Sequence, residues 1–186
     1  MNVQPNLHMD KAAFLAWVQG REERYELANG RVVMMTGGSR AHGQITLNLF
    51  RALDARLDPD RWTILSDFGV DVGPETIRYP DIVVDPAVDA PRDLTATAPV
   101  LVAEVLSPST ERVDLGDKAA EYLRVQSLAA YLVFAQDEFK AWVWTRSPDD
   151  FPPGPKVYTE QDPAISIGRL GIDLPLAEIY ARVKFD

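Results

Sequence analysis

Residues 100–106 read Val-Leu-Val-Ala-Glu-Val-Leu, an almost unbroken apolar run with one carboxylate inside it. Such a run is typical of a central β-strand that is covered on both faces of its sheet. A carboxylate in this setting is costly to bury unless it is paired or binds a metal. Glu104 is therefore the most informative residue of the chain, and its strand is expected near the middle of the fold.

A second acid, Asp81, opens another apolar strand, which we expect over residues 79–84. Two carboxylates on adjacent strands can converge on one cation, and hard oxygen ligands suit Mg²⁺ or Mn²⁺. Such an ion polarises a phosphoryl oxygen and lowers the pKa of an attacking water. The two acids together predict a metal site for phosphodiester hydrolysis. Taken alone, Asp81 would be interpreted as a turn residue after Pro80.

Periodicity and turn signals predict the other elements. Helices are expected over residues 10–19, 40–57 and 114–126, with a closing helix from about Pro175. Strands are expected over residues 62–72, 130–135, 139–145, 156–160 and 164–168, and a hairpin over 25–33 around Asn29-Gly30. The predicted fold is α/β, a central mixed sheet flanked by helices with a β-hairpin near the N-terminus.

Composition sets the outer bounds. The chain has 186 residues, 46% hydrophobic and 25% charged, which fits one soluble domain over residues 1–186. The absence of cysteine excludes disulfides and thiolate zinc sites, and it is compatible with a cytoplasmic location. No apolar run approaches the roughly 20 residues that span a bilayer, so no membrane partner is expected. The net charge of -9 counts against a protein that simply coats DNA, but less against a nuclease whose acids hold a cation.

The motifs together resemble a known family. The segments are YELANGRVV (25–33), His42, RYPDIVV (78–84), LVAEVLSPST (101–110), DLGDKAAEY (114–122) and AAYLVF (129–134). Pro80-Asp81 followed after a gap by Glu104 resembles the PD-(D/E)XK nuclease core. From about residue 12 to residue 182 the chain resembles the bacterial family known as putative restriction endonucleases, which has the restriction-endonuclease-like fold.

This resemblance implies a Mg²⁺- (or Mn²⁺-) dependent endonuclease with DNA as its partner, and with Asp81 and Glu104 as metal ligands. The family motif expects a lysine two residues after Glu104, but this position is Leu106. Residues 104 and 106 of a strand share a face, so the lysine is missing from the site itself. The resemblance implies that Lys118 replaces it and supplies positive charge to the nucleophile or transition state.

The same resemblance implies further site residues. Glu26 would ligate the metal or orient a water, and His42 would line the cleft. Tyr122 shares a helix face with Lys118, where it would line the cleft or pack in the core. Each site residue also has a structural interpretation. Glu104 could pair with Arg78 or Arg112, Lys118 with Glu121 or Asp114, Glu26 could be a surface residue, and His42 could be an ordinary helix-start histidine.

Two other functions remain open at this stage. The missing motif lysine and the acidic balance favour a catalytically inactive binding or assembly module that retains the nuclease fold. A hydrolase of a small phosphorylated substrate is a third possibility. A homodimer is also expected, because nucleases that act on a duplex often pair their sites. Trp142 and Trp144 share a strand face that could pack on a helix or form the contact between subunits.

Overall fold

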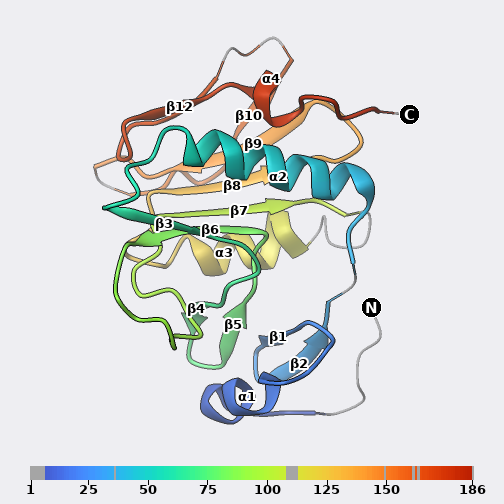
Figure 1. Cartoon of the computed structure of the whole chain (residues 1–186), viewed down its shortest axis with the longest axis vertical. Coiled ribbons are helices and arrows are strands. Elements are labelled where there is room, and N and C mark those ends of the chain that lie inside the picture. Colours follow the sequence, from blue (N-terminus) through green and yellow to red (C-terminus); the bar gives the residue numbers. More distant parts are fainter. Residues whose placement is uncertain are drawn as a thin grey trace.

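A large mixed sheet forms the centre of the protein (Figure 1). The computed structural model describes residues 7–35, 37–107, 113–148, 150–160, 162 and 164–185. Within these ranges six strands form the large sheet in the order β10-β9-β8-β7-β6-β3. Their bounds are β3 Trp62–Leu65, β6 Ile82–Pro86, β7 Leu101–Val105, β8 Ala130–Phe134, β9 Lys140–Thr145 and β10 Lys156–Thr159. Neighbours pair antiparallel except β7 and β8, which are parallel, so the predicted mixed sheet is confirmed.

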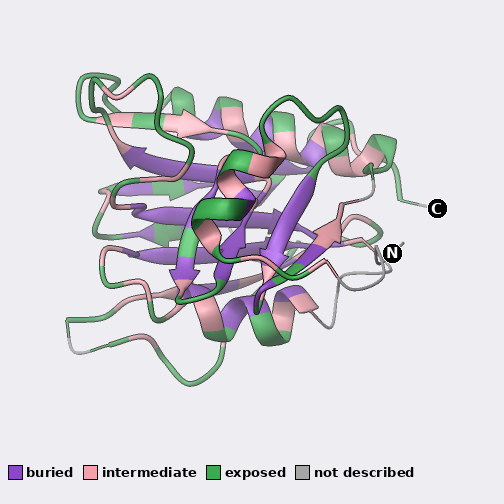
Figure 2. Cartoon of the chain, turned by 90° about the horizontal axis from the view of Figure 1, so that it is seen from below, coloured by how far each residue is buried: buried purple, intermediate pink, exposed green. Residues whose placement is uncertain are grey.

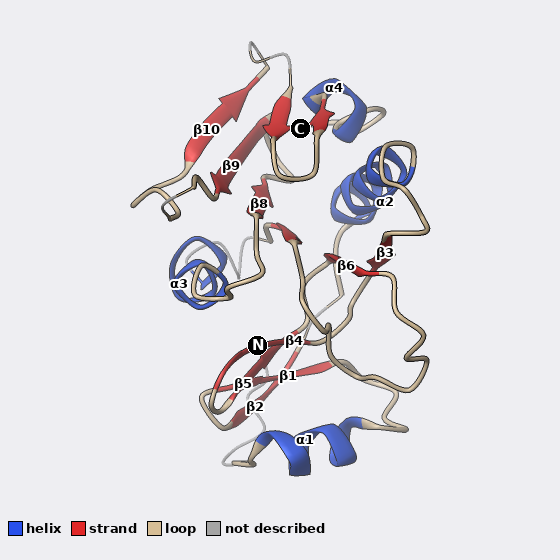
Figure 3. Ribbon diagram, turned by 90° about the vertical axis from the view of Figure 1, so that its left-hand side faces the viewer, coloured by secondary structure: helices blue, strands red, loops and turns tan. Residues whose placement is uncertain are grey.

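Helices cover both faces of the large sheet (Figure 3). Helix α2 (Arg40–Asp54) lies on one face, and its buried side chains Ile45, Leu49 and Leu53 join the main core. The π-helical turn η1 (Val113–Lys118) and helix α3 (Ala119–Tyr122) lie on the other face. Because these two segments connect the parallel strands β7 and β8, they form the crossover of a β-α-β unit. Helix α4 (Leu176–Ile179) packs beside α2.

A second sheet lies below the large one and carries the N-terminal hairpin (Figure 1). Its strands are β2 (Arg31–Met34), β1 (Tyr25–Ala28), β5 (Thr76–Arg78) and β4 (Val70–Gly73), in that order. The predicted turn at Asn29 and Gly30 is confirmed, with φ values of 50° and 74°. Helix α1 (Lys11–Val18) covers this sheet through Phe14. Two further strands, β11 (Ile165–Ile167) and β12 (Ile172–Leu174), form a short ribbon.

The strand expected over residues 62–72 is wrong, because the chain changes sheet within it. Strand β3 pairs with β6 in the large sheet, whereas β4 pairs with β5 in the small one. Between them Asp67 has a φ of 49°, and a Cβ on Gly69 would lie 2.5 Å from the carbonyl oxygen of Leu94. The break therefore requires both an αL residue and a glycine.

Other differences are smaller. The helix expected over residues 114–126 is shorter and begins with the π-helical turn, and the closing helix after Pro175 has four residues. Trp144 is buried, stacks on Tyr131 at 5.4 Å between ring centroids and joins the core that α3 covers, so Trp144 packs within the fold and is not available for a contact between subunits. The homodimer itself stays a prediction. In the part of the chain that the structure describes, no helix is long and apolar enough to cross a membrane.

Alternation along β7 divides its side chains between two cores. Ala103 and Val105 face α2, whereas Val102 faces α3. Glu104 lies between Ala103 and Val105, so the pleat directs its carboxylate to the α3 side. Figure 2 shows buried residues along the strands of the sheets, and every residue of β7 and of its neighbour β8 is buried. The fold therefore places the Glu104 carboxylate between the large sheet and the crossover segment formed by η1 and α3.

Candidate active site

The register of β6 and β7 places the two predicted metal ligands at paired positions. The last pair is Ile82 with Ala103, and one further step along both strands sets Asp81 opposite Glu104. The backbone N–H of Val105 donates to Asp81 Oδ2 at 2.7 Å, which ties the start of β6 to the end of β7. The two acids therefore lie on neighbouring strands, at the same end of the sheet.

Glu104 is buried among groups that donate hydrogen bonds or carry positive charge. It is 5% exposed, and its Oε1 atom accepts from Lys118 Nζ at 2.9 Å and from the Tyr122 hydroxyl at 3.1 Å. Burial raises the pKa of Glu104 to about 8; the Lys118 ammonium opposes this rise, and the carboxylates of Asp114 and Asp81 add to it. Its described ion-pair partner is thus Lys118, whereas Arg78 pairs with Glu26 and Glu121, and Arg112 lies outside the described residues.

Lys118 lies beside Glu104 in the interior of the protein. It ends the π-helical turn, a feature that is frequent at functional sites. Its Nζ atom contacts both Glu104 and Asp114, the latter at 3.0 Å. Burial alone would lower the pKa of Lys118, but the two carboxylates more than offset this effect and the net pKa is raised. Lys118 therefore remains a cation inside the protein, and its expected pair with Asp114 is confirmed, although the pair is buried.

His42 reaches Asp81 from the first turn of α2. Its Nε2 atom lies 2.8 Å from Asp81 Oδ1, and its backbone N–H donates to the capping Ser39 hydroxyl at 3.1 Å. The imidazole packs directly over Gly38, where an added Cβ would lie 2.7 Å from the ring. Burial raises the pKa of Asp81, whereas His42 and the Val105 N–H lower it. Both Asp81 oxygens thus have a partner from this chain.

Glu26 belongs to an adjacent network centred on Arg78. The Arg78 guanidinium donates hydrogen bonds to Glu26 Oε1 at 2.7 Å and to both carboxylate oxygens of Glu121 at 2.7 and 3.0 Å. The second oxygen of Glu26 is buried and has no hydrogen-bond partner among the described residues. Glu26 also lies close enough to Lys118 to raise the pKa of that residue. The structure therefore places Glu26 beside the cluster, joined to it through charge and not through a shared contact.

The described acidic side chains do not form a larger metal-binding group. Among the described residues no group of three or more His, Cys, Asp or Glu side chains could hold a metal ion. Sequence analysis treated Asp114 and Glu121 only as surface partners of Lys118, and it missed the bidentate contact between Arg78 and Glu121. Residues 108–112, which include Arg112 and the end of the LVAEVLSPST motif, lie outside the described residues.

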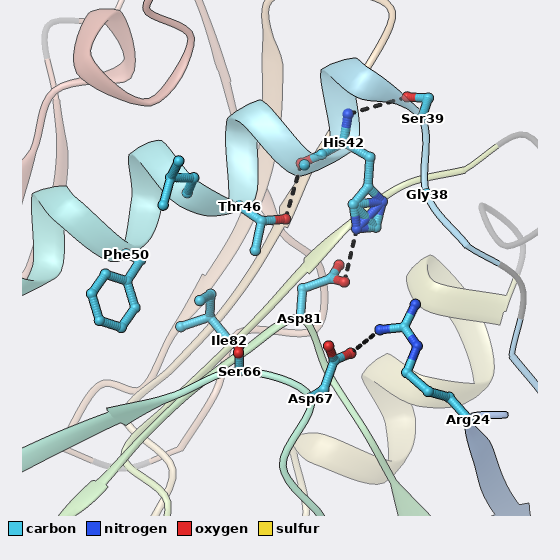
Figure 4. A pocket seen from close by; sticks show the side chains of 12 residues that line it. Arg24, Gly38, Ser39, His42, Thr46, Phe50, Ser66, Asp67, Asp81 and Ile82 are labelled. Atoms are coloured by element: carbon cyan, nitrogen blue, oxygen red, sulfur yellow. Dashed lines mark hydrogen bonds and ion pairs between the residues drawn. The ribbon is translucent and has the colours of Figure 1, made fainter. Parts of the chain in front are cut away.

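A cavity of about 330 Å³ lies next to Asp81, which forms part of its lining (Figure 4). One wall is a face of α2, and the opposite wall is the break between β3 and β4 together with Arg24. The lining side chains include His42, Thr46, Leu47, Phe50, Ser66 and Asp67. The guanidinium of Arg24 forms an ion pair with Asp67 across the mouth. The candidate site therefore combines a buried acid–lysine cluster with a cavity next to it.

A mixed sheet with paired acids at the ends of adjacent strands, and a lysine from the following helix, defines an α/β protein of the nuclease-like class. The chain belongs to the Uma2 family, described as "Putative restriction endonuclease", whose profile matches residues 12–174. Two uncharacterized proteins of Synechocystis sp. are similar in sequence. One is 31% identical over 73% of this chain and 73% of its own length, and the other is 29% identical over 67% and 73%.

A solved structure shares the fold. It is a crystal structure from Anabaena variabilis, titled as a putative nuclease belonging to DUF820. The two structures superpose with a TM-score of 0.77 over 95% of this chain and 99% of the other, at 16% sequence identity. At this identity the likeness establishes the architecture, and the predicted nuclease-like fold is confirmed.

Proposed function

We propose that this chain is a divalent-metal-dependent endonuclease that hydrolyses DNA phosphodiester bonds, with Asp81 and Glu104 as the ligands of Mg²⁺ or Mn²⁺. The observation that carries the proposal is the position of Asp81 directly before β6, one residue beyond the pair of Ile82 with Ala103 and thus next to Glu104, with Lys118 in contact with Glu104. Membership of the Uma2 family supports nuclease chemistry. DNA is the substrate that the description of this family favours.

The donor set fits the proposed ion. Mg²⁺ is commonly held by one or two carboxylates and fills its remaining positions with water and phosphate oxygens. When bound, it would polarise the phosphoryl group and lower the pKa of the attacking water. Asp81 is bordered by the 330 Å³ cavity, so a phosphate could approach it from that side. Two carboxylates without a third acidic ligand are therefore compatible with Mg²⁺.

The other residues of the cluster have separate roles in this proposal. Lys118 carries the positive charge that would stabilise a hydroxide or the developing charge of the transition state. The pKa of Tyr122 is raised well above its ordinary value by burial, so its hydroxyl stays protonated and keeps donating to Glu104. Arg78 holds Glu26, whose second oxygen is buried and could orient a water. His42 keeps Asp81 oriented at the cavity.

A second candidate is a non-catalytic binding or assembly module that retains the fold. It is favoured by one observation: Lys118 already neutralises Glu104, and His42 and a backbone N–H already occupy Asp81. Related folds carry unrelated functions, so this arrangement could be purely structural. The two candidates differ in whether a divalent cation displaces these internal contacts.

Calorimetric titration with Mn²⁺ tests the proposal without knowledge of the substrate. The wild type should bind one ion, and Asp81→Asn and Glu104→Gln should each abolish or greatly weaken binding. Asp89→Asn, which removes an exposed acid outside the cluster, is the control and should bind as the wild type does. Anomalous density in Mn²⁺-soaked crystals would locate the ion.

Cleavage assays with Mn²⁺ would then separate the substrates. Nicking of plasmid DNA supports the endonuclease, whereas turnover of a small phosphodiester alone would favour the third function, a small-substrate hydrolase. A folded wild type that binds no Mn²⁺ at millimolar concentration would reject the metal site and leave the inactive module.

A further inference from the structure

Gly43 is a glycine that the fold itself does not require. It lies in the first turns of α2, where glycine is the poorest helix former except for proline. Its backbone has no positive φ, and a Cβ added there would meet none of the described atoms within 4 Å. Neither backbone conformation nor close packing therefore explains it. Gly43 lines the cavity beside Asp81, and a larger side chain at this position would extend into that space.

The walls of this cavity offer both apolar and charged contacts (Figure 4). On α2, Leu47 and Phe50 follow Gly43 at helical spacing, so the three line one side. Leu47 is 45% exposed, one of the few large apolar side chains on the described surface. Across the mouth, Arg24 and Asp67 form an exposed ion pair, which is weak and can exchange partners.

We propose that this cavity is a subsite for one unpaired nucleotide of a single-stranded DNA segment. The inference rests on the proposed function, because the phosphate of that nucleotide would lie beside Asp81. The base would lie over the backbone at Gly43, where no Cβ obstructs it, with its apolar surface against Leu47 and Phe50. Arg24 would exchange Asp67 for a phosphate oxygen of the strand.

Size and charge select an unpaired nucleotide over a duplex. Ligand cavities span about 300–1,000 Å³, so a volume of 330 Å³ is at the small end and suits one nucleotide unit. Duplex binding depends on a track of cations that neutralises many phosphates, whereas this chain has a net charge of -9. Single-strand binding combines cationic contacts to the backbone with stacking of bases on aromatic side chains, and this cavity offers Arg24 for the first and Phe50 for the second.

The decisive variant is Gly43→Met, which fills the cavity with a side chain that favours the helix. Ala16→Met is its control, because Ala16 is an exposed helical position on α1. Binding is measured by fluorescence anisotropy with a labelled oligothymidylate of about eight nucleotides. Gly43→Met should weaken binding about tenfold or more, the loss expected for one stacked base. Ala16→Met should bind as the wild type does.

A second pair of variants guards against a folding defect in Gly43→Met. Leu47→Ser removes apolar surface from the wall and should also weaken oligothymidylate binding, whereas Val157→Ser, at 43% exposure on β10, should not. The inference is overturned if Gly43→Met melts as the wild type does and still binds with wild-type affinity. It is also overturned if an unlabelled duplex of the same length competes better than the single strand.

Metal binding is measured separately on the same proteins. Gly43→Met should bind Mn²⁺ with wild-type affinity, because Gly43 provides no metal ligand. A subsite that fails while Mn²⁺ still binds rejects this inference alone. Oligothymidylate binding that depends on Gly43 in a protein that binds no Mn²⁺ supports the subsite and rejects the proposed metal chemistry.

Discussion

Replacing Lys118 with methionine tests whether the acid cluster depends on an internal cation. Lys118 Nζ lies 2.9 Å from Glu104 and 3.0 Å from Asp114, and all three side chains are buried. Methionine preserves the length and apolar stem of lysine but removes the charge. Two buried carboxylates then lose their partner, and breaking a buried pair in this way costs about 3–5 kcal/mol. The free energy of unfolding of the metal-free protein should fall by this amount.

Urea denaturation at about pH 9 measures the loss, because Glu104, whose pKa is about 8, is then ionised. Lys140→Met is the matched control, because Lys140 pairs at 3.0 Å with the exposed Glu138 and such pairs contribute about 1 kcal/mol or less. The loss in Lys118→Met should shrink as the pH falls, since Glu104 can then take up a proton and become neutral. Saturating Mn²⁺ should restore more stability to Lys118→Met than to Lys140→Met. Equal losses in the two variants at every pH would refute the reasoning.

Three further predictions concern neighbouring groups. The pKa of Glu104 is about 8 in the folded protein and 4.5 in the unfolded chain. The free energy of unfolding of the metal-free protein should therefore fall as the pH rises from 4.5 to about 8. Urea titrations should show a flatter pH dependence for Glu104→Gln. Arg78→Lys should lower the free energy of unfolding by about 2 kcal/mol or more in the same assay. A lysine ammonium cannot make the bidentate contact with Glu121 and also bind Glu26. Wild-type stability of this variant would contradict the prediction. Gly38→Ala should displace the His42 ring and shift its NMR signals, whereas Gly37→Ala, with open space above it, should leave them in place.

The sequence predicted those parts of the fold that local patterns determine. The apolar run over residues 100–106 and the Asn29-Gly30 turn carry strong local signals, and both are confirmed. The sheet change at Asp67 was missed because apolar alternation continues through Phe68 and Val70 although the strand does not. Periodicity reports which side of a strand is buried, but it does not report which sheet the strand joins.

In the candidate site, too, residues with a local sequence signal were predicted, whereas contacts between distant parts of the chain were not. Asp81 and Glu104 were found because an acid is unexpected at the start or in the middle of an apolar strand. The network of Arg78 was not found, because its contacts join residues 52 and 43 positions apart in the chain. Contacts of this length depend on the packing of the small sheet against α3, which no local pattern encodes.

The sheet change between β3 and β4 also bears on how relatives can diverge. Strands β3 and β6 are partners in the large sheet, with Trp62 opposite Pro86, although residues 66–80 between them leave to build half of the small sheet. The departure and return points of this excursion are adjacent, so insertions or deletions within it need not alter the register that pairs Asp81 with Glu104. A relative could thus reshape the cavity wall at Ser66 and Asp67 while the paired acids stay unchanged, which separates evolution of substrate choice from evolution of the chemistry.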